Sequence, residues 1–103
     1  MIVLTKDNFK AEVEEYKGLV VIDLFAVWCG PCKMIAPIVE ALSEEYTDVK
    51  FCKINVDDEP ELARAFKVSS IPTIAFVKDN TFLDMSVGYV PKEKLASLIE
   101  EYK

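Results

Sequence analysis

Residues 19–46 read LVVIDLFAVWCGPCKMIAPIVEALSEEY, and this stretch decides the fold. Its first seven residues are apolar on both alternating faces apart from Asp23, a pattern typical of a parallel strand buried on two sides. Beyond the WCGPC turn, apolar residues recur every three or four positions as far as Tyr46, which predicts a long amphipathic helix kinked at Pro37. A buried strand followed by such a helix is the building unit of an α/β sheet.

The segments on either side alternate between strand-like and helix-like patterns. In chain order we expect a strand at Ile2–Leu4, a helix over about Asp7–Lys17 with Gly18 as its C-cap, a strand at Val49–Val56, a short helix at Pro60–Phe66, strands at Thr73–Val77 and Phe82–Val87, and a last helix through Leu95, Leu98, Ile99 and Tyr102 with Pro91 near its first turn. The four residues KDNT between the last two strands suit an antiparallel hairpin. The order predicts a mixed sheet between helices.

Composition favours one globular domain spanning residues 1–103. The net charge of −6 disfavours nucleic acid as the main partner, because binding a phosphate backbone requires clustered Lys and Arg. The longest apolar run, Leu19–Cys29, is far shorter than a bilayer span and contains Asp23. No leader pattern precedes Thr5. We therefore expect a cytoplasmic protein that does not associate with membranes.

The chain has three cysteines and no histidine, which limits the metal sites and the redox chemistry that it can support. Cys29 and Cys32 are separated by two residues, a spacing shared by redox dithiols and zinc clips. Structural zinc takes four ligands, and the only further thiol is Cys52. We therefore expect no metal and interpret Cys29 and Cys32 as a redox pair.

The redox pair opens the long helix. Free N–H groups and the positive end of the helix dipole stabilise an anion, so we expect Cys29 to be the more acidic thiol. Gly30 and Pro31 supply a tight turn and a proline suited to the first helical positions. Cys32 lies one turn further on, close enough for the two sulfurs to bond.

Asp23 interrupts an otherwise apolar strand. In a central strand its carboxyl group is buried, and desolvation raises its pKa, so that it can exchange a proton with a cysteine at the end of its own strand. In an edge strand Asp23 would simply face water. Lys53 is either the counter-charge of Asp23 or a solvated residue of a half-buried strand. Pro72 opens another strand, where proline is tolerated, and base rates favour a trans bond before it.

As a set, these motifs resemble those of the thioredoxin family over essentially the whole chain. The resemblance rests on Asp23, Trp28-Cys29-Gly30-Pro31-Cys32-Lys33, Pro37, Lys53, Ile71-Pro72-Thr73 and Val87-Gly88. It implies the thioredoxin fold, a mixed five-stranded sheet flanked by four helices, and activity as a protein-disulfide reductase.

The resemblance also implies a role for each matching residue. Cys29 would be the attacking thiolate and Cys32 the resolving thiol, with Asp23 as proton acceptor beneath Cys32 and Lys53 beside Asp23. Pro72 would be cis, against the base rate. A substrate strand would pair with the backbone beside Pro72, in a groove lined by Trp28, Gly30, Pro31, Val56, Ile71, Pro72, Val87 and Gly88.

The sequence departs from the family pattern at a few positions. Phe25 stands where many members carry a second Trp, so we expect an altered fluorescence response to oxidation and unchanged chemistry. Ser70 replaces a frequent glycine, and Asn80-Thr81 replaces a glycine-containing turn; neither touches a reacting atom. Cys52 is an extra thiol, which we expect to be buried and inert.

The leading hypothesis is a dithiol reductant of disulfide-containing partner proteins. The chain has no glycine-rich nucleotide-binding fingerprint, so we expect it to bind no cofactor and a separate thioredoxin reductase to supply its electrons. Two alternatives stay open: an oxidising disulfide isomerase, and a non-catalytic module that docks partners through Trp28, Ile71 and Val87. We expect a monomer.

Overall fold

The buried stretch that follows Gly18 forms the middle of the sheet. In the computed structural model, which describes residues 1–103, this strand is β2 (Leu19–Phe25), with a neighbour on each side. The other elements are β1 (Ile2–Val3), the short π-helix η1 (Lys10–Glu14), α1 (Gly30–Glu45), β3 (Lys50–Asn55), α2 (Pro60–Ala65), β4 (Thr73–Lys78), β5 (Thr81–Val87) and α3 (Lys92–Tyr102). The predicted order of strands and helices is confirmed, with ends displaced by a residue or two except in the first helix.

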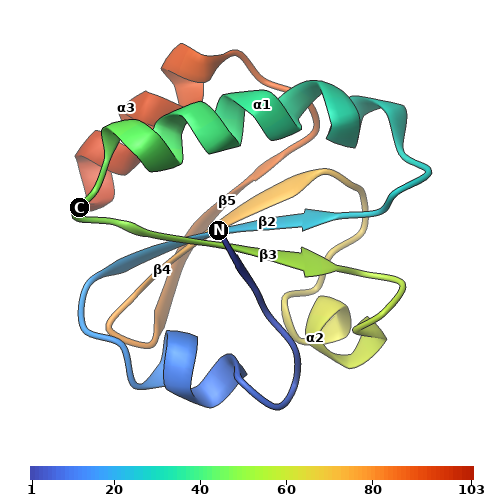
Figure 1. Ribbon diagram of the computed structural model, residues 1–103, viewed down its shortest axis with the longest axis horizontal. Coiled ribbons are helices and arrows are strands. Elements are labelled where there is room, and N and C mark those ends of the chain that lie inside the picture. Colours follow the sequence, from blue (N-terminus) through green and yellow to red (C-terminus); the bar gives the residue numbers. More distant parts are fainter.

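The five strands form one mixed sheet in the order β1-β3-β2-β4-β5. β1, β3 and β2 run parallel, whereas β4 is antiparallel to β2 and β5 is antiparallel to β4. Figure 1 shows α1 and α3 packed over one face, with α2 and the blue N-terminal helix over the other. The mixed five-stranded sheet flanked by four helices, as expected from the sequence, is confirmed.

Each face of the sheet has its own apolar core, because alternate side chains of a strand point to opposite faces. One core lies against α1 and α3 and contains Leu19, Val21, Phe51, Phe76, Leu95 and Ile99. The other lies against η1 and α2 and contains Val20, Ile22, Leu24, Cys52 and Ile54. Asp23 shares the parity of Val21 and Leu19, so it faces the α1 side. None of the helices combines the length and the apolar character required to cross a membrane.

The first predicted helix was wrong in its extent. In place of a helix over Asp7–Lys17 capped by Gly18, the structure has a turn at residues 6–8 and the five-residue η1. The amide of Glu15 donates to the carbonyl oxygen of Lys10, five residues back, and the ammonium group of Lys50 donates to the carbonyl oxygen of Glu12. The bond from Lys50 ties the backbone of η1 to β3 close to the point where the helix ends.

The hairpin between β4 and β5 is tighter than predicted. The strands extend to Lys78 and from Thr81, which leaves only Asp79 and Asn80 as the turn rather than four residues. Both have positive φ, 51° and 62°, as a two-residue turn of this handedness requires and as Asn and Asp tolerate. The side chain of Asp79 also accepts a hydrogen bond from the amide of Gly18 at 2.9 Å, which fixes the turn beside the start of β2.

Candidate active site

Cys29 and Cys32 lie where β2 gives way to α1. Cys29 is the N-cap of α1 in an extended conformation, and Pro31 occupies the first helical turn, where its missing N–H has no partner to lose. The amide of Cys32 donates to the sulfur of Cys29 at 3.2 Å. A backbone donor and a helix N-terminus both favour negative charge on that sulfur in the reduced protein.

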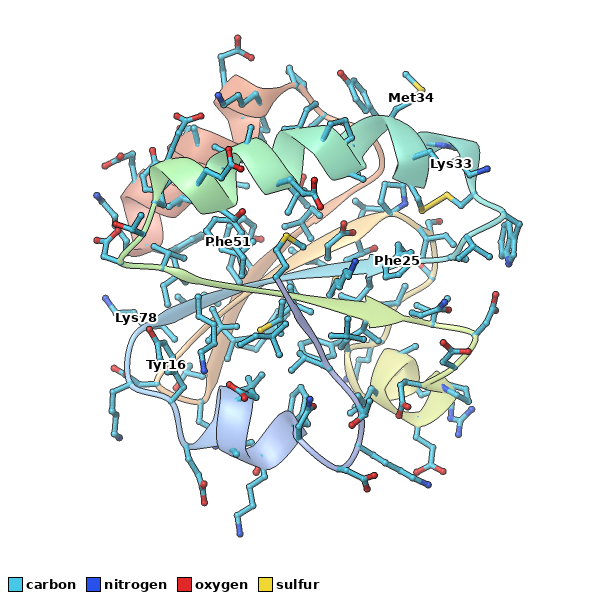
Figure 2. The ribbon with its side chains drawn as sticks, in the orientation of Figure 1. Tyr16, Phe25, Lys33, Met34, Phe51 and Lys78 are labelled. Carbon is cyan, nitrogen blue, oxygen red and sulfur yellow. A yellow bond between two sulfur atoms is a disulfide. The ribbon has the colours of Figure 1, made fainter.

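The two cysteines form a disulfide, with their Cα atoms 5.2 Å apart. Figure 2 shows the yellow sulfur–sulfur bond at the start of α1 beside Lys33, with Phe25 below it on the sheet. The sulfurs differ in their surroundings. Cys29 Sγ lies 3.8 Å from the carbonyl oxygen of Ile71, whereas Cys32 lines a cavity together with Asp23. The two sulfurs of the pair therefore face different groups.

Asp23 is buried in the central strand, which excludes the edge-strand interpretation. Only 4% of the residue is exposed, and Oδ1 has no hydrogen-bond partner. Burial raises the pKa of Asp23 from 3.8 to about 6, and the positive charge of Lys53 limits the rise. Its carboxyl group therefore changes protonation state close to neutral pH, as an acid–base group must.

Lys53 is the residue directly across from Asp23 in the pairing of β2 with β3. Its charge lowers the pKa of Asp23, which is consistent with the counter-charge interpretation. The two groups do not form a direct ion pair within 4.0 Å; instead the Lys53 ammonium lies 5.9 Å from the centre of the Phe25 ring. Lys53 therefore lowers the pKa of Asp23 through its charge without forming a direct ion pair with it.

A cavity of about 260 Å³ links these groups. Asp23, Cys32 and Lys53 line it, with apolar walls from Phe25 and Ala36. The predicted proton acceptor and the predicted resolving thiol therefore border the same space. Ala36 was not singled out from the sequence, although it lies one helical turn beyond Cys32 on the same face of α1, which is a signal that the spacing already carries.

The residues predicted to form a substrate groove gather around the Cys29 side of the disulfide. Trp28, Val56 and Ile71 line a second hollow of about 230 Å³. The Ile71–Pro72 bond is cis, as the family resemblance implies. The amide of Gly88 donates to the carbonyl oxygen of Pro72 at 2.8 Å, next to Val87 at the end of β5. Gly30 and Pro31 lie in the first turn of α1 itself.

Trp28 is 68% exposed, unusual for so large an apolar side chain. Its indole N–H donates to the carboxylate of Asp57 at 2.8 Å, which holds the ring in place while its face stays open. The sequence analysis did not identify Asp57 as a site residue. Its position in a turn just after β3 was visible, but its partner lies 29 residues away along the chain.

Cys52 lies apart from this chemistry. It is fully buried among the apolar residues of the core on the α2 side. Burial raises the pKa of its thiol to about 11, so the thiolate is scarce at neutral pH. The structure contains no group of three or more Cys, His, Asp or Glu side chains that is placed to hold a metal ion.

Comparison with known proteins shows which family the chain belongs to. The family model described as thioredoxin matches residues 1–101. The chain belongs to the thioredoxin family. It is 46% identical over 99 residues to thioredoxin of Bacillus subtilis, covering 95% of this chain and 93% of that protein. It is 41% identical over 100 residues to thioredoxin 1 of Synechococcus elongatus, covering 96% and 94%.

A solved structure supports the same assignment. The X-ray structure of Fasciola hepatica thioredoxin superposes with a TM-score of 0.93 at 42% identity and covers 100% of both chains. As a thioredoxin-family protein with Cys29 and Cys32 at disulfide distance, the chain is a thiol–disulfide oxidoreductase that reduces protein disulfides through this dithiol.

Proposed function

We propose that Cys29 is the attacking sulfur, that Cys32 resolves the mixed disulfide, and that Asp23 accepts the proton of Cys32. The observation that supports this most directly is the asymmetry of the two sulfurs: Cys29 receives the amide hydrogen of Cys32, whereas Cys32 shares a cavity with a buried carboxyl group. Lys53 acts through Asp23, because its charge favours the carboxylate form that can accept a proton.

The proposed cycle has two sulfur exchanges. The Cys29 thiolate attacks one sulfur of the partner disulfide, that disulfide breaks, and the other partner sulfur leaves as a thiolate. Cys32 then gives its proton to Asp23 and attacks the Cys29 sulfur, which breaks the mixed disulfide and releases the second partner sulfur. Two electrons pass to the partner, and the Cys29–Cys32 disulfide remains.

The partner would dock on the exposed side of the site. The indole of Trp28, fixed by Asp57, and the exposed Val87 flank the hollow that contains Val56 and Ile71. An extended segment of the partner would bind beside the backbone of Pro72, with Gly30, Pro31 and Gly88 allowing close approach because they place little or no side-chain bulk there. The exposed apolar surface also supports docking that is independent of the cysteines, which the test below separates.

We also propose an oligomeric state, a cellular location and an electron donor for the protein. The net charge of −6 suits a monomer that diffuses freely between partners, and we propose that the chain acts as one thioredoxin domain in the cytoplasm. A separate thioredoxin reductase would return two electrons to the disulfide, as part of an electron-transport chain that maintains cell redox homeostasis.

The decisive experiment compares Cys29→Ser and Cys32→Ser in the reduction of insulin disulfides. Both variants should lose turnover, because each lacks one of the two sulfurs. Only Cys32→Ser should accumulate a covalent complex with the partner, seen on a non-reducing gel, because its Cys29 attacks and nothing resolves the product. Cys52→Ser is the control and should keep the parent rate.

The outcomes separate the alternatives. Accumulation in Cys29→Ser instead would reverse the assignment of the two sulfurs. Insulin reduction that is no faster with the parent protein than with the double variant Cys29→Ser/Cys32→Ser would support docking without dithiol chemistry and overturn the cycle.

A further inference from the structure

We propose that the cavity beside Asp23 and Cys32 is a binding site for a small, neutral molecule with an apolar body and a single O–H or N–H donor, of which phenol is the simplest probe. The binding part of this inference follows from the cavity alone. Its effect on catalysis rests on the function proposed above.

The size and the walls of the cavity define the apolar body. Its volume is about 260 Å³, just below the roughly 300–1,000 Å³ typical of sites for drug-sized ligands. Phe25, Ala26 and Val27 line it from the end of β2, and Ala36 lines it from α1. One ring or a short branched chain would bury its carbon surface against these side chains.

The polar group of the ligand is inferred from Asp23, which lines the cavity. Oδ1 of Asp23 is buried and accepts no hydrogen bond, although buried polar atoms are almost always paired. A small rotation of the carboxyl group would turn this oxygen toward the cavity that Asp23 lines, where a donor on a bound molecule would satisfy it. Because carboxylate oxygens only accept, a ligand with one donor fits this oxygen better than a hydrocarbon of the same size.

The charges around the cavity select against ions. Lys33 and Lys53 line it with one sign of charge, and Asp23 and Glu40 line it with the other. A cation would meet two ammonium groups and an anion two carboxyl groups, so neither gains enough attraction to offset the loss of its own hydration. A neutral molecule avoids that cost.

The cavity is separate from the proposed docking surface. None of Trp28, Ile71, Pro72 or Val87 lines it. A molecule could therefore occupy it while a partner protein is bound to Cys29. Its donor would engage the oxygen that should receive the proton of Cys32, so the second sulfur exchange would slow while the first stays unchanged.

Binding is tested by titrating the reduced, isotopically labelled protein with phenol and with toluene, following backbone amide resonances. Phenol should bind about tenfold more tightly than toluene, the order expected for one hydrogen bond to a charged acceptor, with the largest shifts at Phe25, Ala36 and Lys53. Asp23→Leu, which removes the acceptor and the buried charge, should abolish this preference. Equal affinities in the parent protein would overturn the proposal.

Two matched variants locate the molecule. Ala36→Phe fills the cavity and should abolish phenol binding. Ala65→Phe places the same ring on α2, in the other apolar cavity on the opposite face of the sheet, and should leave binding unchanged. Loss of binding in Ala65→Phe alone would assign phenol to that other cavity and overturn the proposal.

The effect of phenol on catalysis is measured separately from its binding. Saturating phenol should leave the rate of mixed-disulfide formation unchanged and slow the release of the reduced partner severalfold, in the parent and in Ala65→Phe but not in Ala36→Phe. A protein that binds phenol and reduces no disulfides would refute the proposed function and leave the binding site standing. Normal reduction with no phenol binding would refute only the site.

Discussion

Two lysines of β3, three residues apart, meet acidic groups in opposite ways. Lys50 is 18% exposed at its side chain and forms a close ion pair with Glu12 at 2.7 Å. It also donates to the carbonyl oxygen of Glu12 and lies 4.0 Å from the centre of the Tyr16 ring. Lys53, across from Asp23, forms no such pair, and Oδ1 of Asp23 is left without a partner.

The difference separates a structural charge from a reactive one. The Lys50–Glu12 contact ties η1 to the sheet and satisfies both partners, so it contributes to stability. A contact of that kind at Asp23 would hold the carboxylate ionised and lower its pKa. The open arrangement instead leaves the pKa of Asp23 at about 6, where it can take up and release a proton.

The largest effect should come from Asp23→Asn. Because burial raises the pKa of Asp23 from 3.8 to about 6, the folded state binds the proton more tightly than the unfolded chain. The stability this gives is present at low pH and is lost as pH rises through about 6. Urea unfolding of the oxidised protein should show Asn more stable than Asp by about 3 kcal/mol above neutral pH.

The same variant has an internal control. Near pH 3 the two proteins should differ little, because Asp23 is then protonated when folded and, with an unfolded pKa of 3.8, largely protonated when unfolded. An equal advantage of Asn at both pH values would show that the effect is not ionisation. Partner release by the Asn variant should also be slower above pH 6 and lose its rise through about that pH.

The next effect should come from Lys50→Met. It leaves the partly buried carboxylate of Glu12 unpaired and frees the carbonyl oxygen at the end of η1. The free energy of unfolding should fall by about 1–2 kcal/mol, with insulin reduction unchanged. The matched control is Lys10→Met, which removes an exposed pair with Glu15 and should cost less than about 0.5 kcal/mol. Equal losses of unfolding free energy in Lys50→Met and Lys10→Met would contradict the structural role given to the Lys50–Glu12 contact.

The smallest effect should come from Lys53→Met. Removing the cation that lowers the pKa of Asp23 should move that pKa above 6. The midpoint of the pH dependence of partner release should shift upward with it, and carbon NMR of the Asp23 carboxyl group measures the same midpoint directly. A midpoint that stays in place or moves down would mean that Lys53 does not act on Asp23 in this way.

The fold was predictable wherever a local pattern fixed it. The apolar run of β2 and the helical spacing of α1 carry their own signal, and the mixed sheet between helices followed from the alternation of elements, although the order of its strands did not. The short extent of η1 was not predictable from its own apolar spacing, and its backbone bonds to a lysine 38 residues away. The two-residue turn at Asp79 and Asn80 was missed because strand ends depend on pairing rather than on the turn sequence alone.

The candidate site also has parts that the sequence predicts and parts that it does not. The cysteine pair and the start of α1 follow from sequence spacing, whereas the burial of Asp23 needed the central position of β2 in the sheet. The relation of Asp23 to Lys53 needed the register of β2 on β3, and the bond from Trp28 to Asp57 needed the path of the turn after β3. The cavity arises from side chains of separate elements, and no single stretch of sequence encodes it.

The buried third cysteine gives the protein a built-in reporter of global opening. Cys52 is 0% exposed, whereas Cys29 and Cys32 are 5% and 4% exposed, so a thiol-modifying reagent added to the reduced, folded protein should react with the two active-site sulfurs before it reaches Cys52. The third should react only as fast as the β-sheet transiently comes apart. Its modification rate therefore times spontaneous unfolding under native conditions, without denaturant and without an added probe.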